Sequence, residues 1–200
     1  VWSPAVFEPQ DESDDDLAEQ FDENEDDMHA SGIPAARGWR LDPRHADTFA
    51  FKDRVLRMFS EQLGILGWAP EHVAPGALPL VPERVTIKRI TNALTNAVFF
   101  VGYDAASLPA PPTVLLRVYG AGSEALLSRR AELLILHTLS SLYEIGPHIL
   151  GTFANGRVEE FYECYSIGQE GMRDLGTPRA EGPAHWVARR MREMHEVPLD

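Results

Sequence analysis

The sequence predicts an α+β fold in which a five-stranded antiparallel sheet carries one long helix on one face. Two observations predict it. Short alternating runs of β-branched and aromatic residues recur between residues 84 and 162, and one long helical pattern interrupts them after the third run. A helical extension precedes the sheet, and an acidic segment opens the chain.

The N-terminal segment carries most of the net charge. Asp and Glu occupy 12 positions between Glu8 and Asp27, and the first basic residue is Arg37. The other 19 acidic residues nearly balance the 18 basic ones, so the net charge of -13 says little about the partners of the folded part. A self-repelling run with few apolar residues buries too little surface to fold, so we expect residues 1–30 to be a disordered acidic tail. A solvated tail is favoured over an acidic docking segment.

The composition also indicates a compartment. The single cysteine, Cys164, excludes an internal disulfide and fits a reducing environment. No stretch approaches the roughly 20 apolar residues that span a bilayer, and no basic segment followed by an apolar one opens the chain. We therefore expect a cytoplasmic protein that does not span a membrane. Because the sequence starts at Val1 rather than Met, we expect a fragment or a processed product.

The extension has one clear helix, within residues 47–63. Asp47 or Thr48 can cap it. Apolar residues recur at helical spacing and form one face: Phe51, Val55, Leu56, Phe59 and Leu63. The proline-rich residues 67–83 then end regular structure and connect the helix to the sheet.

Three strands, a helix and a hairpin follow. The strands are predicted at residues 84–90, 97–103 and 113–119, with a proline-rich loop at 104–112 between the last two. The long helix is predicted at 123–146, with Ser123 as its cap and Gly146-Pro147 as its end. The dipeptide Asn155-Gly156 predicts a hairpin between two further strands. Residues 182–197 are again helical.

This order of elements is that of the small lobe of a kinase. In that fold the turn between the first two strands lies over the nucleotide phosphates, where backbone amides and small polar side chains donate to anionic oxygens. Here the turn reads "TNALTN", without glycine. Protein kinases use glycines there, whereas Thr95 and Asn96 offer hydroxyl and amide donors.

A charged pair is predicted beneath that turn. Arg117 interrupts an apolar strand, and Glu132 lies among leucines in the long helix. In the kinase fold a strand cation and a helix glutamate pair below the phosphates. The alternative is that Arg117 extends into water at a sheet edge and Glu132 is an ordinary surface residue. The order of the elements favours the pair.

Several segments resemble the choline/ethanolamine kinase family, especially its fungal type. They are "ALTNAVFFV", "TVLLRVYG", "SRRAELLILHTLSSLYEIGPHILGTFANGRVEEF" and "ARRMREMHEV". The segment "GIPAARGWRLDPRHADTFAFKDRVLRMF" is similar to the choline kinase N-terminal domain. The resemblance implies three parts: the acidic tail at 1–30, the N-terminal extension at 31–83, and a protein-kinase-like N-terminal lobe at 84–200. The C-terminal lobe is expected to be absent.

The resemblance also implies site residues. Arg117 matches the ATP-contacting arginine of the family, and the order of the elements adds Glu132 as its expected partner in the helix. The phosphate loop comprises Asn92, Ala93, Leu94, Thr95, Asn96, Ala97 and Val98, and the adenine-binding hinge comprises Glu160, Phe161 and Tyr162. Asn92 stands where relatives often have glycine, but asparagine tolerates positive φ better than most residues. Glu160 replaces a frequent glutamine, which matters little if the main chain binds adenine.

The implied activity is transfer of the γ-phosphoryl group of ATP to choline, for phosphatidylcholine biosynthesis, with ATP and Mg²⁺ as cofactors. Choline and ethanolamine both stay open as substrates, and a homodimer is an option; no nucleic acid partner is expected. His148, His185 and His195 do not match the family's catalytic loop and are expected to be structural. We therefore expect no catalytic or metal-binding residue in this chain, and no activity from it alone.

Two alternatives stay open. One is another small-molecule kinase of the same fold, such as an aminoglycoside phosphotransferase relative, although the extension argues against it. The other is a truncated binding module that acts through the acidic tail.

Overall fold

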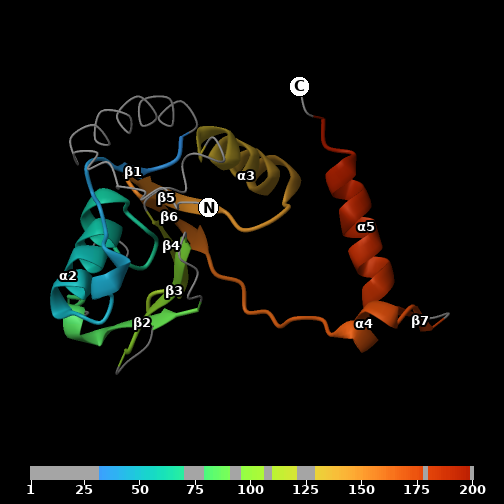
Figure 1. The fold of residues 1–200 in the computed structure, drawn as a ribbon, viewed down its shortest axis with the longest axis horizontal. Helices are drawn as coiled ribbons and strands as arrows, with labels where there is room; N and C mark the ends of the chain where they lie inside the picture. Colours follow the sequence, from blue (N-terminus) through green and yellow to red (C-terminus); the bar gives the residue numbers. More distant parts are fainter. Residues whose placement is uncertain are drawn as a thin grey trace, which may run out of the picture.

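The computed structural model describes residues 32–69, 79–90, 96–105, 110–120, 129–177 and 180–198. The acidic tail expected at 1–30 lies outside these ranges. In the described part, one sheet is flanked by α2 and α3, while α4 and α5 stand away from it (Figure 1).

The elements follow the predicted order. The N-terminal part contains β1 (Ala35–Ala36), η2 (Pro43–His45), α2 (Phe49–Arg57), the π-helical turn η3 (Met58–Gln62) and η5 (Pro82–Arg84). The central part contains β2 (Val85–Arg89), β3 (Asn96–Tyr103), β4 (Val114–Tyr119), α3 (Arg129–Tyr143), β5 (Ile149–Phe153) and β6 (Gly156–Glu160). The C-terminal part contains α4 (Gln169–Arg173), β7 (Gly176–Thr177), β8 (Ala180–Glu181) and α5 (Pro183–His195).

The main sheet has six strands in the order β1-β5-β6-β4-β3-β2. Strands β2 to β6 pair antiparallel, which confirms the predicted five-stranded sheet. The sixth strand, β1, comes from the extension and pairs parallel to β5. Two alanines give no period-2 signal, so the sequence did not reveal it.

Helix α2 forms because its N-terminus is capped and its apolar face is buried. The hydroxyl of Thr48 accepts from the backbone N–H of Phe51 at 3.2 Å, so Thr48 is the cap. All five residues of the predicted apolar face are buried against the sheet. Trp68 continues this core, and its Nε1–H donates to the carbonyl of Pro112 at 2.9 Å.

The predicted Asn155-Gly156 hairpin joins β5 to β6. The side chain of Asn155 binds the backbone of Leu41, accepting from its N–H at 3.0 Å and donating to its carbonyl at 2.8 Å. Gly156 is required here because a Cβ would overlap the ring of Phe153 and the carbonyl oxygen of Arg117. The extension is thus fastened to the tip of the hairpin.

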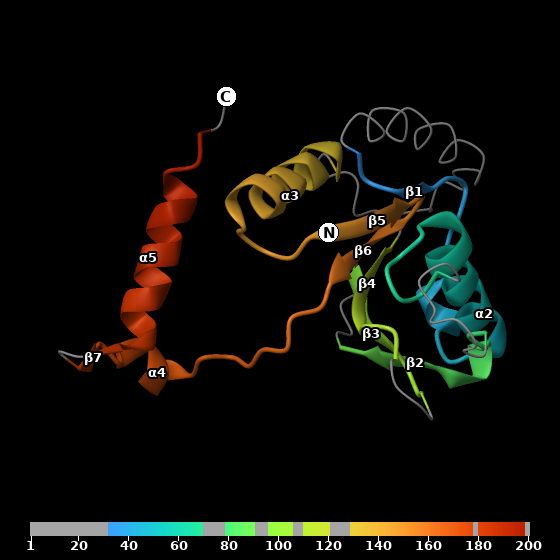
Figure 2. The ribbon, with the colours of Figure 1, turned by 180° about the vertical axis from the view of Figure 1, so that it is seen from behind.

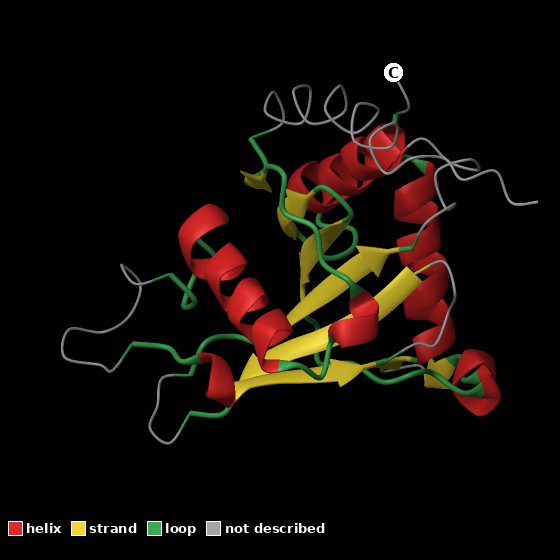
Figure 3. Cartoon of the chain, turned by 60° about the vertical axis from the view of Figure 1, so that its left-hand side comes forward, coloured by secondary structure: helices red, strands yellow, loops and turns green. Residues whose placement is uncertain are grey.

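Helix α3 covers part of the opposite face of the sheet (Figure 3). Leu133 packs with Ile149 of β5 and with Ile33. The helix ends at Tyr143, before Gly146, which has φ of 84°. The predicted cap Ser123 lies outside the described residues.

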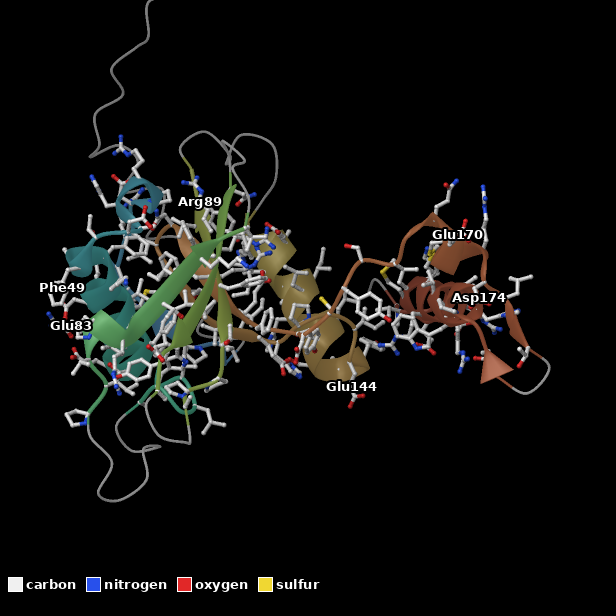
Figure 4. All side chains as sticks on the ribbon, turned by 90° about the horizontal axis from the view of Figure 1, so that it is seen from below. Phe49, Glu83, Arg89, Glu144, Glu170 and Asp174 are labelled. Atoms are coloured by element: carbon white, nitrogen blue, oxygen red, sulfur yellow. The ribbon has the colours of Figure 1, made fainter. Side chains whose placement is uncertain are left out.

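Helices α4 and α5 bury no residue in the core under α2 or in the smaller cluster under α3. Residues 161–168 run as an extended connection from β6 to α4 (Figure 2). No described residue of α4 or α5 is buried. Arg190 of α5 donates to the backbone carbonyl of Glu144 at 2.8 Å, and Glu144 lies at the end of α3 nearest to α5 (Figure 4). Among the described helices, none has the length and apolar character needed to cross a membrane.

Candidate nucleotide site on the charged face of the sheet

A charged cluster occupies the face of the sheet turned away from α2. Its centre is the pair β4 and β6, whose register places Arg117 directly opposite Arg157. Both strands are interior strands of the sheet. Arg117 therefore does not lie at a sheet edge, which excludes the predicted alternative of an arginine extending into water there.

One carboxylate lies between the two arginines. Oε1 of Glu159 is 3.4 Å from Nε of Arg117, and the same oxygen accepts from Nε of Arg157. Glu159 lies two positions after Arg157 in β6, on the same face of the strand. The shared carboxylate offsets the repulsion that two facing guanidinium groups would otherwise produce.

Three side chains form hydrogen bonds with Arg157. Its Nη1 donates to the hydroxyl of Tyr119 and, at 3.0 Å, to Oε1 of Glu132 in α3. Burial opposes ionisation of the guanidinium, but Tyr119, Glu159 and Glu132 outweigh it, so the pKa of Arg157 lies above its ordinary value. The buried side chain, 4% exposed, is thus charged and engaged through two of its three nitrogens, Nε and Nη1.

The predicted direct pair between Arg117 and Glu132 does not form. Glu132 pairs with Arg157, and Arg117 pairs with Glu159. The reason is the position of α3: Leu133, next to Glu132, packs on Ile149 of β5, so the helix approaches the sheet from the β5–β6 side. Glu132 therefore lies closer to Arg157 of β6 than to Arg117 of β4.

The predicted phosphate loop is described only at its end. Asn92, Ala93, Leu94 and Thr95 lie outside the described residues, whereas Asn96, Ala97 and Val98 open β3. Val98 lies directly opposite Arg117, and Asn96 directly opposite Tyr119. Ala97 belongs to the core on the α2 side. Strand β3 therefore begins two residues before the position opposite Arg117.

The predicted hinge lies at the other end of the same face. Glu160 ends β6 and donates its backbone N–H to the carbonyl of His148 at 2.9 Å. Phe161 packs edge-on against Phe100 of β3, with ring centroids 4.8 Å apart. The hydroxyl of Tyr162 donates to the carbonyl of Gly146 at 3.2 Å. In the part of the chain described, the amides of Phe161 and Tyr162 have no backbone partner.

Sequence reasoning missed three members of the cluster: Tyr119, Arg157 and Glu159. A signal was present in "GRVEE", where a cation and a carboxylate alternate around a valine after the hairpin turn. That pattern places both charges on one face but does not say which strand lies beside them. The described ranges hold no group of three His, Cys, Asp or Glu side chains suited to a metal ion.

An antiparallel sheet, a helix that presents a glutamate to its charged face and an arginine in an interior strand together define the small lobe of a kinase-type fold. The model of the choline/ethanolamine kinase family matches residues 87–200. This chain belongs to that family, as its sequence indicated.

Three curated relatives show the extent of the similarity. Choline kinase of Schizosaccharomyces pombe is 35% identical over 154 residues, which cover 74% of this chain and 29% of the relative. Choline kinase of Saccharomyces cerevisiae is 37% identical over 121 residues, covering 60% and 19%. Ethanolamine kinase of the same yeast is 31% identical over 164 residues, covering 80% and 27%. The chain thus matches less than a third of each of these relatives.

A solved choline kinase from Cryptosporidium parvum aligns with 60% of this chain and 30% of its own, at a TM-score of 0.44 and 24% identity. A solved ethanolamine kinase of Plasmodium vivax aligns with 77% of this chain and 40% of its own, at a TM-score of 0.47 and 20% identity.

Proposed function

We propose that this chain is the N-terminal part of a choline kinase that transfers the γ-phosphoryl group of ATP to the hydroxyl of choline. The product, phosphocholine, would serve phosphatidylcholine synthesis in the cytoplasm. The observation that carries the proposal is the difference between the two facing arginines. Arg157 is 4% exposed and engaged by three side chains, whereas Arg117 is 27% exposed. Of these two arginines, Arg117 is therefore the one that a ligand can reach.

Arg117 would bind the ATP phosphates together with the turn at Asn92–Val98. Support comes from the register, which sets Val98 opposite Arg117 and so brings the end of the turn to the arginine. A guanidinium group suits phosphate because it can donate two parallel hydrogen bonds. Thr95 and Asn96 would add neutral donors to the same phosphates.

The hinge proposal concerns adenine. Glu160 makes the last ladder pair of β6 with β4, and Phe161 and Tyr162 follow it out of the sheet. Phe161 turns its ring to Phe100, so its side chain is occupied and its backbone can face a ligand. Adenine would bind through these backbone groups, which makes the identity of Glu160 a minor matter.

The reacting groups would come from elsewhere. Phosphoryl transfer requires a residue to accept the hydroxyl proton and carboxylates to hold Mg²⁺, which neutralises charge on the phosphates. The described residues provide no such metal group. We therefore propose that a C-terminal lobe supplies them and that this chain alone is inactive.

Ethanolamine is the second candidate substrate, because ethanolamine kinase of Saccharomyces cerevisiae is 31% identical over 80% of this chain. The test is to produce both this chain and a longer protein that contains it, and to follow phosphate transfer from labelled ATP. We expect the longer protein to phosphorylate choline, and ethanolamine more slowly, while this chain phosphorylates neither.

Other outcomes would overturn the proposal. Transfer to an aminoglycoside, but not to choline or ethanolamine, would favour the related small-molecule kinase. A transcript that ends at Asp200 would favour the truncated binding module, whereas a downstream exon that encodes the catalytic loop would exclude it.

A further inference from the structure

Two arginines that face each other on interior strands share a single carboxylate. Oε1 of Glu159 lies 3.4 Å from Nε of Arg117 and also accepts from Nε of Arg157. Glu159 itself is 7% exposed. An ionised carboxylate is buried at this depth only where paired charges compensate its lost hydration.

The two arginines differ in what they have left to offer. Arg157 uses Nε for Glu159 and Nη1 for Tyr119 and Glu132. Nε of Arg117 lies 3.4 Å from Glu159 as an ion pair without a hydrogen bond, and among the described residues Arg117 has no other ion-pair partner. Among the described residues, no hydrogen bond or ion pair engages its terminal nitrogens, Nη1 and Nη2, so their N–H groups are available to a ligand.

From this geometry we propose that Glu159 and Arg157 are positioning residues that direct Arg117 toward the phosphates of ATP. The inference rests on the function proposed above and deepens it. Glu159 holds the Nε side of the Arg117 guanidinium, so the remaining terminal N–H groups can bind phosphate oxygens. Arg157 holds Glu159 in place and, through Glu132, ties α3 to the same point of the sheet.

The same contacts explain why neither residue binds phosphate itself. Arg157 is buried and its Nε and Nη1 are engaged, so its charge serves Glu159 and Glu132. If the Glu159 charge were removed, the guanidinium groups of Arg117 and Arg157 would repel each other across neighbouring strands. Arg117 would then leave its position, although it would keep its own charge.

The test is Glu159→Gln in the longer kinase that contains this chain. Glutamine keeps the size and one acceptor oxygen but removes the charge. We expect the KM for MgATP to rise about tenfold, because Arg117 would lose about one charge-assisted hydrogen bond to the phosphates. The KM for choline and the inhibition constant of adenosine, which lacks phosphates, should stay within about twofold. The matched control is Glu83→Gln, since Glu83 is exposed in η5, just before β2, and lies away from the cluster (Figure 4).

Arg117→Ala, measured in parallel, separates the two claims. If Arg117→Ala leaves the KM for MgATP unchanged, the proposed phosphate site is wrong, and the positioning inference falls with it. If Arg117→Ala raises that KM but Glu159→Gln does not, the positioning inference is overturned while the proposed function stands. Equal losses for MgATP and adenosine in Glu159→Gln would show a merely structural role and would also overturn it.

If Glu159→Gln does not fold, a second variant tests the same inference. Glu159→Asp keeps the negative charge but withdraws it by one methylene from both arginines. We expect a smaller rise in the KM for MgATP, again without a change for adenosine. A folded Glu159→Asp kinase with an unchanged KM for MgATP would contradict the inference.

Discussion

The two faces of the sheet differ in what they bury. The face toward α2 forms a hydrophobic core, in which Leu116 and Val118 of β4 are fully buried together with residues of the extension. The opposite face of the same strand carries Arg117 and Tyr119 beside Arg157 and Glu159. In β4, Leu116 and Val118 therefore stabilise the core, while Arg117 and Tyr119 belong to the charged cluster.

The largest expected effect lies on the α2 face. Phe59 is fully buried and packs edge-on against Trp68, with ring centroids 5.2 Å apart. Phe59→Ala should lower the free energy of unfolding by about 3 to 5 kcal/mol, because it removes buried area and leaves a cavity. Urea unfolding followed by tryptophan fluorescence measures this. A loss below about 1 kcal/mol would show that the extension does not share the core of the sheet.

A smaller effect is expected at Thr95 of the proposed phosphate loop. Thr95→Ala, in the longer kinase, should lower kcat/KM for ATP by less than Arg117→Ala does, since a neutral donor is about half as strong as a charged one. Steady-state kinetics of the two variants side by side give the ratio. A larger loss for Thr95→Ala would place the main phosphate contact in the turn rather than at Arg117.

The smallest effect is expected in α5, which belongs to neither face. Trp186 is 55% exposed, and no described residue of α5 is buried. Trp186→Ala should change the free energy of unfolding of this chain by less than about 0.5 kcal/mol. A loss of several kcal/mol would mean that α5 is packed against apolar surface in solution.

Local patterns predicted most of this fold. The cap Thr48, the apolar face of α2 and the Asn155-Gly156 hairpin are each encoded within a few residues, and the structure confirms them. Strand β1 escaped because its two alanines carry no local pattern, and it forms only where β5 offers an edge. Pairing across distant elements, rather than local preference, determines such a strand.

The charged cluster was only half predictable for a related reason. Arg117 and Glu132 stand out in the sequence as charges within apolar runs, but their partners depend on register and on where α3 lies. The pairing of β4 with β6, which are not consecutive strands, brings Arg157 opposite Arg117. No local rule fixes that register, so the sequence suggested one ion pair where the structure has a shared carboxylate.

The central claim is that Arg117 on the charged face binds the phosphates of ATP. Arg117→Ala in the longer kinase tests it directly, with kcat/KM for ATP and thermal unfolding measured on the same preparation. We expect a loss of roughly 2 to 4 kcal/mol in transition-state stabilisation, which is about two to three decades in rate, with the protein still folded. An unchanged kcat/KM for ATP in a folded variant would contradict the claim.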